Sequence, residues 1–446
     1  MGSFSKTTRV LRALLCGTPQ KNLSKIKKPI PLQTYFNRAY KEALLKHQLG
    51  DQPADDSTNK LHVPITLIAH AKSGTAHTYV GIYHDEMHFS ASLLKAAVMY
   101  AAFKLLAEAE ALAAAPPAGG FSNQNALFAA LKQQFHSSDA VPAIRNAGAA
   151  AGLVPRYADI LQVTGFGGTD GLTVAFAPEF YHSLHEDHDL YKAYLDIRRA
   201  DNLGKDKDGN LVENARSRAA LGGVSHMYKM IVWSNNVSAG ECIRRLGYAY
   251  INVKLIEAGF FEPDADHPKG IWIGGDYVGI APRIEVDSVN DDKVALATTS
   301  RHMAEFFSRV KLGILPHSDG MLELFQEAQQ SEPSWLTRHG PRAFDVEGVK
   351  IGFANIKPNV KPLGPNVYSE GIIFSWDTTG ALPDEKLPKD YDLKGDFAAC
   401  WQNLRADVIA ANKPAHNISD SEDSEYDGVA EVIKNAFENF LNQTPV

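Results

Sequence analysis

The chain has 446 residues, of which 44% are hydrophobic and 22% charged, a composition typical of a globular protein with a substantial core. Its formal net charge of −7 gives no broad basic surface for a nucleic acid, and no apolar tract approaches the roughly 20 residues that span a bilayer. The three cysteines are widely spaced, which indicates neither a disulfide framework nor a metal site. We therefore expect no cofactor, metal ion, nucleic-acid partner or integral membrane segment.

Residues 1–45 are predicted to form a basic N-terminal extension, because lysines and arginines occur there with no acidic residue before Glu42. A basic surface arm, an amphipathic surface helix, a transit-like peptide and an ordinary structural helix all fit this pattern. The apolar core at residues 13–16 is too short for a convincing secretory signal, so a cytoplasmic location is favoured.

The following elements are predicted in chain order. Residues 61–83 indicate two strands around a turn at 72–74, and an apolar helix runs from Ser92 to about Ala114. Further helices are expected at 226–246, at 250–259, from a cap at 298–300 to about 312, at 396–411 and at 428–441, with strands at 344–356 and 366–376. Strands near both ends and a mostly helical middle predict one sheet with an inserted helical subdomain.

Ser92 and Lys95 lie in the first turn of the expected apolar helix. Residues three apart share one helix face, with β-carbons about 5–6 Å from each other, so these side chains can touch. Burial and the positive end of the helix dipole both lower a lysine pKa, and a neutral lysine beside a serine hydroxyl is a general base beside a nucleophile. An isolated pair with this spacing also fits a lysine that reaches solvent from the rim of the helix.

Two further motifs follow in the chain. Ser234-Asn235-Asn236 comes after an apolar run and before a helical pattern, and Val349-Lys350-Ile351-Gly352 lies in an expected strand. With Ser92-x-x-Lys95 after a strand pair, they resemble the motifs of the penicillin-recognising serine hydrolases, namely serine β-lactamases of the class A type, D-alanyl-D-alanine peptidases (penicillin-binding proteins) and their esterase relatives. The order of the motifs agrees with that family across roughly residues 60 to 440.

The resemblance implies roles for the catalytic residues. Ser92 is expected to be the acylated nucleophile, Lys95 its activating base, and Ser234 the group that relays a proton to the leaving group. Efficient class A β-lactamases also use a loop glutamate to activate the deacylating water. Glu285 is a candidate for that deacylation base, although the accompanying Glu-x-x-Leu-Asn pattern is absent and an exposed loop acid is the alternative.

The resemblance also implies substrate-binding residues. Asn236 is expected to contact the substrate amide and to brace the lysine base, and Lys350 to supply positive potential. The oxyanion hole is expected from the backbone N–H of Ser92 and that of Phe353, which follows Gly352.

The chain departs from the family pattern at Ile351, where a threonine or serine hydroxyl usually binds the substrate carboxylate. A hydrogen bond to a charged group commonly contributes about 1.5–3 kcal/mol, so an uncharged ester or amide fits this chain better than a penicillin or a peptide C-terminus. An apparent insertion at about 115–225 is expected to narrow substrate choice or to form an interface.

Two other patterns in the sequence have simpler interpretations. Tyr250-Ile251-Asn252 matches the Tyr-x-Asn of other branches of the family, but it lies inside a helical pattern, and we prefer Ser234. His182, His185 and His188 recur every three residues among acidic residues, which favours a solvated surface over a metal site.

The sequence therefore predicts an α/β (α+β) fold of the β-lactamase/transpeptidase-like type, with an antiparallel sheet flanked by N- and C-terminal helices. One domain over 46–446 would hold an inserted helical subdomain at about 92–300. The predicted function is a serine hydrolase that acts through an acyl-enzyme on Ser92, on a small-molecule or peptide-like ester, amide or β-lactam-like substrate. One alternative is a non-catalytic or slowly acylating binding or sensor protein, and another is a true β-lactamase or D-Ala-D-Ala carboxypeptidase. The sequence leaves the oligomeric state open.

Overall fold

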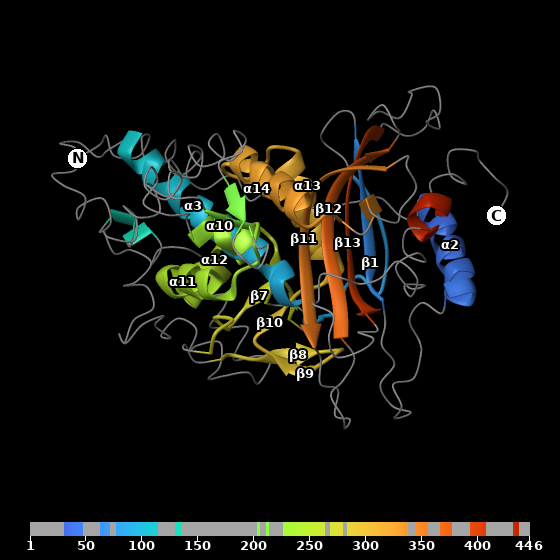
Figure 1. Ribbon diagram of the computed structural model, residues 1–446, viewed down its shortest axis with the longest axis horizontal. Coiled ribbons are helices and arrows are strands. Elements are labelled where there is room, and N and C mark those ends of the chain that lie inside the picture. Colours follow the sequence, from blue (N-terminus) through green and yellow to red (C-terminus); the bar gives the residue numbers. More distant parts are fainter. Residues whose placement is uncertain are drawn as a thin grey trace, which may run out of the picture. The chain divides into compact units, whose positions relative to one another are not determined.

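One antiparallel sheet joins strands from the two ends of the chain (Figure 1). Its five strands lie in the order β11-β12-β13-β1-β2, and each neighbouring pair is antiparallel. They are β1 (Ile65–Ala71), β2 (Thr78–Ile82), β11 (Phe344–Asn355), β12 (Asn366–Trp376) and β13 (Leu393–Ala406). The hairpin predicted at 61–83 and the two strands predicted at 344–356 and 366–376 are thus confirmed.

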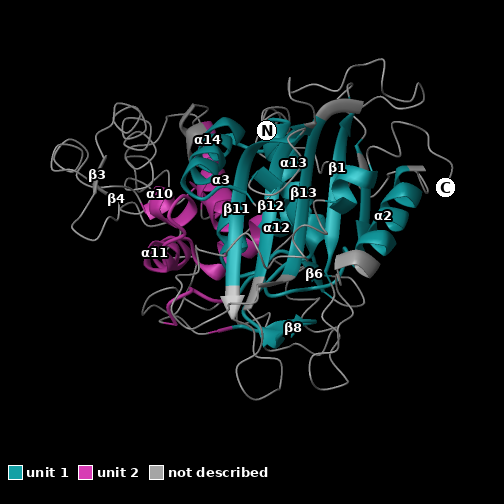
Figure 2. Cartoon of the chain, turned by 45° about the vertical axis from the view of Figure 1, so that its right-hand side comes forward, with its two compact units in different colours: residues 1–96, 255–274, 284–446 teal, residues 97–254, 275–283 magenta. Residues whose placement is uncertain are grey.

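The computed structural model describes residues 31–47, 63–71, 77–114, 130–131, 133–134, 203–205, 211–213, 226–263, 268–279, 283–334, 336–337, 344–355, 366–376, 393–406 and 431–436. The chain divides into two compact units (Figure 2). Unit 1 comprises residues 1–96, 255–274 and 284–446, and unit 2 comprises residues 97–254 and 275–283. Most of the insertion expected at 115–225, including His182, His185 and His188, lies outside the described residues.

Helices near the two ends of the chain cover one face of the sheet. α2 (Pro31–His47) buries Leu32 and Phe36, which lie one helical turn apart. The helical residues 431–436 bury Val432 in the same hydrophobic cluster as the sheet. The predicted antiparallel sheet with terminal helices is therefore confirmed, and part of the expected N-terminal extension contributes to the core.

α13 (Ser300–Lys311) packs across the other face of the sheet, against β1, β12 and β13. Gly371 and Ile372 are adjacent in β12 and point to opposite faces, Ile372 into the cluster with the terminal helices. A Cβ at Gly371 would lie 2.2 Å from the ring of Phe307, so glycine lets the helix approach the strand closely. Thr299 caps the helix by accepting a backbone N–H bond of 3.2 Å, as predicted for residues 298–300.

The segment from about 260 to 297, for which no element was predicted, contains short paired strands in unit 1. β5 pairs with β6, β7 with β10 and β8 with β9, each antiparallel. They are β5 (Phe261–Glu262), β6 (Lys269–Gly270), β7 (Trp272–Ile273), β8 (Val286–Ser288), β9 (Asp292–Val294) and β10 (Leu296–Ala297). Strands of two or three residues carry too little periodicity for a sequence pattern to reveal.

The described part of unit 2 consists mainly of helices. They are most of α3 (Lys95–Ala114), α10 (His226–Ile231), α11 (Asn236–Leu246) and most of α12 (Tyr248–Glu257), with a small hairpin of β3 (Leu203–Lys205) and β4 (Leu211–Glu213). Glu108 of α3 accepts a bond of 2.8 Å from Lys254 and one of 3.0 Å from the Tyr250 hydroxyl. The buried pair of Arg244 and Asp276 is 2.9 Å apart. Paired charges of this kind compensate each other's burial.

The helix predicted at 396–411 is wrong, because residues 393–406 form strand β13. β13 lies between β12 and β1, which both bond to its backbone. Phe397, Ala399 and Trp401 join the cluster under the terminal helices, whereas Ala398 and Cys400 point to the opposite face. A strand buried on both faces is an unbroken apolar run, and such a run does not distinguish a strand from a buried helix.

The single helix predicted at 226–246 is also wrong in detail. α10 ends at Ile231 and α11 begins at Asn236, and Ser234 between them has a φ of 53°. Asn235 then caps α11 by accepting the N–H of Ser238 at 2.8 Å. The Ser-x-Asn motif therefore begins in the turn between two helices and ends at Asn236, the first residue of α11. α14 (Ser318–Ser331), for which no element was predicted, packs against β11.

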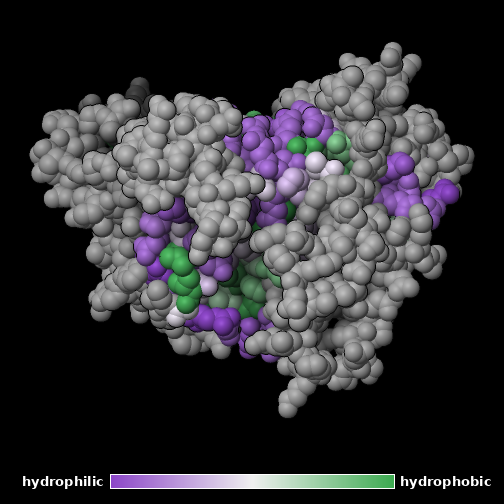
Figure 3. Space-filling view, viewed as in Figure 1, coloured by the Kyte–Doolittle hydropathy of each residue, from purple (hydrophilic) through white to green (hydrophobic). Residues whose placement is uncertain are grey.

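The described surface carries scattered apolar side chains. Figure 3 shows hydrophilic residues over much of the described part of one face, with smaller hydrophobic patches between them. Val237 and Val289 are the exposed large hydrophobic residues of the described part, and single residues of this kind are ordinary on a protein surface. None of the described helices is both long and apolar enough to cross a membrane.

Candidate active site

The candidate nucleophile lies in a single 3₁₀ turn at the start of α3. The turn, η2 (Ala91–Leu94), leads directly into Lys95, the first residue of the α-helix. Because a 3₁₀ turn has three residues, Ser92 and Lys95 fall on one face, and Lys95 Nζ lies 2.9 Å from Ser92 Oγ. Ser92 is partly exposed whereas Lys95 is fully buried. The serine is therefore accessible from solvent, whereas the lysine nitrogen that its hydroxyl contacts is shielded from it.

Burial gives this lysine an unusual charge state. Burial, as the larger effect, and the positive charge of Lys350 together lower the pKa of Lys95 from 10.5 to about 6. At pH 7 the amine is therefore mostly neutral, and its lone pair can accept the serine proton. The lysine predicted from the Ser-x-x-Lys spacing is buried and does not reach solvent from a helix rim.

Lys350 is the second buried lysine of the site. Burial lowers its pKa to about 8, and the charge of Glu332 partly offsets this effect. Lys350 acts on the pKa of Lys95 without a reciprocal effect. This asymmetry follows from the order of titration, since Lys95 has already lost its charge at the pH at which Lys350 titrates. Near neutral pH the site thus combines one neutral and one mostly charged lysine.

Gly352 brings β11 into direct contact with the nucleophile turn. A Cβ there would lie 2.1 Å from the carbonyl oxygen of Ser90 and 2.8 Å from the backbone nitrogen of Leu93. Lys350 and Gly352 are two positions apart, so they point to the same face of the strand. Ile351 points to the other face and packs in the cluster under the terminal helices. The position that departs from the family pattern therefore serves the core.

The remaining predicted residues fall in both units. In unit 1, Phe353 is partly buried against the core cluster, and Glu285 is a partly buried residue just before β8. In unit 2, Ser234 is partly buried in its turn and Asn236 is an exposed first residue of α11. The roles expected for these four residues stay predictions.

The alternative motif at Tyr250 and Asn252 has structural functions within α12. Both side chains are fully buried. The tyrosine hydroxyl donates to Glu108, and the Asn252 amide donates to the carbonyl of Tyr248 at 2.9 Å.

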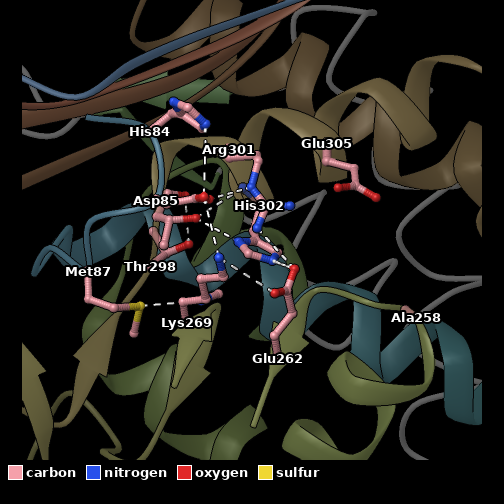
Figure 4. A network of polar contacts seen from close by, with 12 residues as sticks. His84, Asp85, Met87, Ala258, Glu262, Lys269, Thr298, Arg301, His302 and Glu305 are labelled. Carbon is pink, nitrogen blue, oxygen red and sulfur yellow. Dashed lines mark hydrogen bonds and ion pairs between the residues drawn. The ribbon is translucent and has the colours of Figure 1, made fainter. Parts of the chain in front are cut away.

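An ionic network connects the segment that leads to the nucleophile, through Asp85, with other elements of unit 1 (Figure 4). Asp85 and Glu262 both bond to the guanidinium of Arg301, and Lys269 lies 3.4 Å from Asp85. Glu262 also lies 3.1 Å from Nε2 of the buried His302, and this bond is the main reason that the pKa of Glu262 falls to about 2. The network joins the turn after β2 to β5, β6 and the start of α13.

Sequence reasoning missed the polar residues that hold the backbone before Ser92. Asn290, Gln402 and Asn403 are buried and bond to this segment or to one another. Gln402 and Asn403 are polar residues inside the apolar run of β13, which is a signal of a buried polar contact. Because the segment was predicted to be a helix, the sequence did not indicate which residues they contact.

Comparison with known proteins finds similarity at the level of structure. No protein-family model and no curated protein matches the chain. A class A β-lactamase from Bacteroides cellulosilyticus DSM 14838 has 10% identity and a TM-score of 0.42, over 93% of this chain and 100% of that one. A β-lactamase from Chitinophaga pinensis DSM 2588 has 10% identity and a TM-score of 0.40, over 91% and 98%. Both proteins are β-lactamases, and their likeness to this chain is one of fold alone, at low identity and TM-scores below 0.5.

Proposed function

We propose that this protein is a serine hydrolase that forms an acyl-enzyme on Ser92. The observation that carries the proposal is the contact of 2.9 Å between Ser92 Oγ and a fully buried Lys95 Nζ, whose pKa is lowered to about 6. A buried, neutral amine has no structural advantage over an apolar side chain, since its desolvation is costly. Its placement against a partly exposed hydroxyl favours a chemical role.

The first step follows from these two groups. Ser92 Oγ attacks the carbonyl carbon of the substrate, and its proton passes to Lys95 Nζ. The tetrahedral intermediate carries a negative oxygen, which the backbone N–H groups of Ser92 and Phe353 are proposed to stabilise together with the charge of Lys350. The intermediate collapses to an ester of Ser92, and the leaving group takes a proton, which we assign to relay through Ser234.

Deacylation requires water to attack the ester of Ser92. The proton of this water passes to a base, for which Glu285 is our candidate. The base then passes that proton to Ser92 Oγ as the ester bond breaks and the acid product leaves. Asn236 is proposed to hold the substrate amide. Position 351 offers no hydroxyl for a substrate carboxylate, and its isoleucine packs in the core, which supports an uncharged ester or amide as the substrate class.

Intact-protein mass spectrometry after incubation with a penicillin, a cephalosporin and p-nitrophenyl acetate tests the proposal. We expect at least one reagent to add its acyl mass to the parent protein and not to Ser92→Ala. Ser331→Ala is the matched control, because this exposed serine lies at the end of α14 and should leave acylation unchanged. An adduct that persists in Ser92→Ala would contradict the proposal.

The reagent that reacts distinguishes the alternatives. Reaction with p-nitrophenyl acetate alone indicates an esterase or amidase, and reaction with a lactam indicates a β-lactamase or carboxypeptidase. Binding of a reagent without an adduct would indicate a binding or sensor protein, which is the competing proposal.

A further inference from the structure

The three residues before the nucleophile turn are each held by a different part of unit 1. His88 forms an antiparallel bridge with Thr298 through backbone bonds of 2.9 and 3.0 Å. The side-chain amide of Asn290 bonds to both backbone groups of Phe89, accepting its N–H at 2.8 Å and donating to its carbonyl at 3.1 Å. Ser90 Oγ accepts a bond of 2.6 Å from Gln402 Nε2.

These contacts form one buried network. Gln402 Nε2 also donates to the carbonyl of Thr298 at 3.0 Å, so it ties the bridge to the serine beside it. Asn290 Nδ2 also donates to Asn403 Oδ1 at 3.2 Å, and Asn403 is the neighbour of Gln402 in β13. The side chains of Asn290 and Gln402 are 2% and 0% exposed, so water does not compete for their hydrogen bonds.

The backbone becomes strained directly after this network. Ala91 has a φ of 45°, a left-handed conformation that is unfavourable for a residue with a Cβ. Such a conformation persists only where the surroundings impose it. Ala91 follows the held Ser90 and precedes Ser92, and it turns the chain from the bridge at His88 into the 3₁₀ turn.

We infer that Gln402 and Asn290 are positioning residues, which hold Ala91 in its left-handed conformation and so align Ser92 Oγ with Lys95 Nζ. Neither residue contacts the reacting atoms. The inference rests on the proposed function, since it assigns to these amides the geometry of the acylation step. Relaxation of Ala91 would move Ser92 away from its base while leaving the lysine buried.

The test uses Gln402→Met in the full chain, a variant of similar length without the two donors. The measured quantity is the first-order rate constant for release of p-nitrophenolate from p-nitrophenyl acetate as Ser92 is acylated. We expect this constant to fall about tenfold at saturating ester, with the half-saturating concentration changed by less than about twofold. The pH at which the rate rises should stay the same, because the burial of Lys95 is unchanged.

A rescue separates positioning from general support of the fold. Glycine adopts positive φ without steric cost, so adding Ala91→Gly to Gln402→Met should restore most of the lost rate. Gln329→Met is the matched control: Gln329 bonds to Thr337 and to the backbone of Ser334, and its loss should lower stability without changing acylation.

Each outcome decides the inference. An unchanged rate in Gln402→Met, or a loss that Ala91→Gly does not restore, would overturn it. If Gln402→Met does not fold, Asn290→Asp takes its place, because it keeps the acceptor for the Phe89 N–H and loses the donor to the Phe89 carbonyl. Failure of the proposed function is distinct, since the parent would then remain unacylated or Ser92→Ala would still be labelled.

Discussion

Replacing Lys95 by methionine should make the protein more stable and inactive. The pKa of Lys95 is about 6 in the folded protein, against an ordinary value of 10.5. At pH 7 the unfolded chain therefore binds a proton there that the folded chain mostly lacks, which costs the folded state roughly 5 kcal/mol. Methionine fits a similar volume, and loss of the bond to Ser92 costs about 1 kcal/mol. We expect the free energy of unfolding to increase by about 2–4 kcal/mol, because imperfect packing of the methionine offsets part of the gain.

The pH dependence gives this prediction its sign. The lysine costs the folded state nothing above pH 10.5, the cost grows as the pH falls, and it is constant below about pH 6, where both states bind the proton. The stability difference between Lys95→Met and the parent should therefore be largest near pH 6 and should shrink towards pH 10.

Urea unfolding at pH 6, 7, 9 and 10 measures the stability difference, and acylation by p-nitrophenyl acetate is measured in parallel. The acylation rate should fall by roughly a factor of a thousand, because the serine loses its base. Lys293→Met is the control, since Lys293 is exposed in β9 and should show no such pH dependence. A Lys95→Met protein that is less stable than the parent by the same amount at every pH would refute the reasoning that the lysine is held neutral.

Two further predictions concern β11. The acylation rate should rise with pH near 6, where Lys95 loses its proton, and fall near 8, where Lys350 loses its charge. In Lys350→Met the fall near pH 8 should disappear. The rise should move to higher pH, because the charge that lowers the pKa of Lys95 is gone. If the acylation rate of Lys350→Met still rises near pH 6, the charge of Lys350 does not lower the pKa of Lys95. Gly352→Ala should cost about 1–3 kcal/mol in urea unfolding and should slow acylation, since its Cβ would meet backbone atoms of the nucleophile turn. Gly348→Ala is the control in the same strand: its Cβ would meet the side chain of Phe325 at 2.9 Å, and it should spare acylation.

Local patterns in the sequence were sufficient for several elements. β-branched and aromatic residues on either side of a turn identify the β1 and β2 hairpin, and Thr299 marks the start of α13 through the hydrogen bond that its own side chain makes. Ser92 and Lys95 are three residues apart, so their contact follows from the geometry of any helical turn. Features set by neighbours in the chain can be predicted from the chain alone.

Other features depend on residues far apart in the sequence. The segment at 393–406 is a strand because β12 and β1 bond to it on both sides, and no local pattern contains those partners. The neutral state of Lys95 requires burial by the fold and the charge of Lys350, 255 positions away by the numbering. The left-handed turn at Ala91 is held by Gln402 and Asn290. The sequence by itself thus determined which two side chains meet, whereas only the tertiary structure decided the charge of the lysine and the backbone that presents the serine, because burial and strain arise from the whole fold.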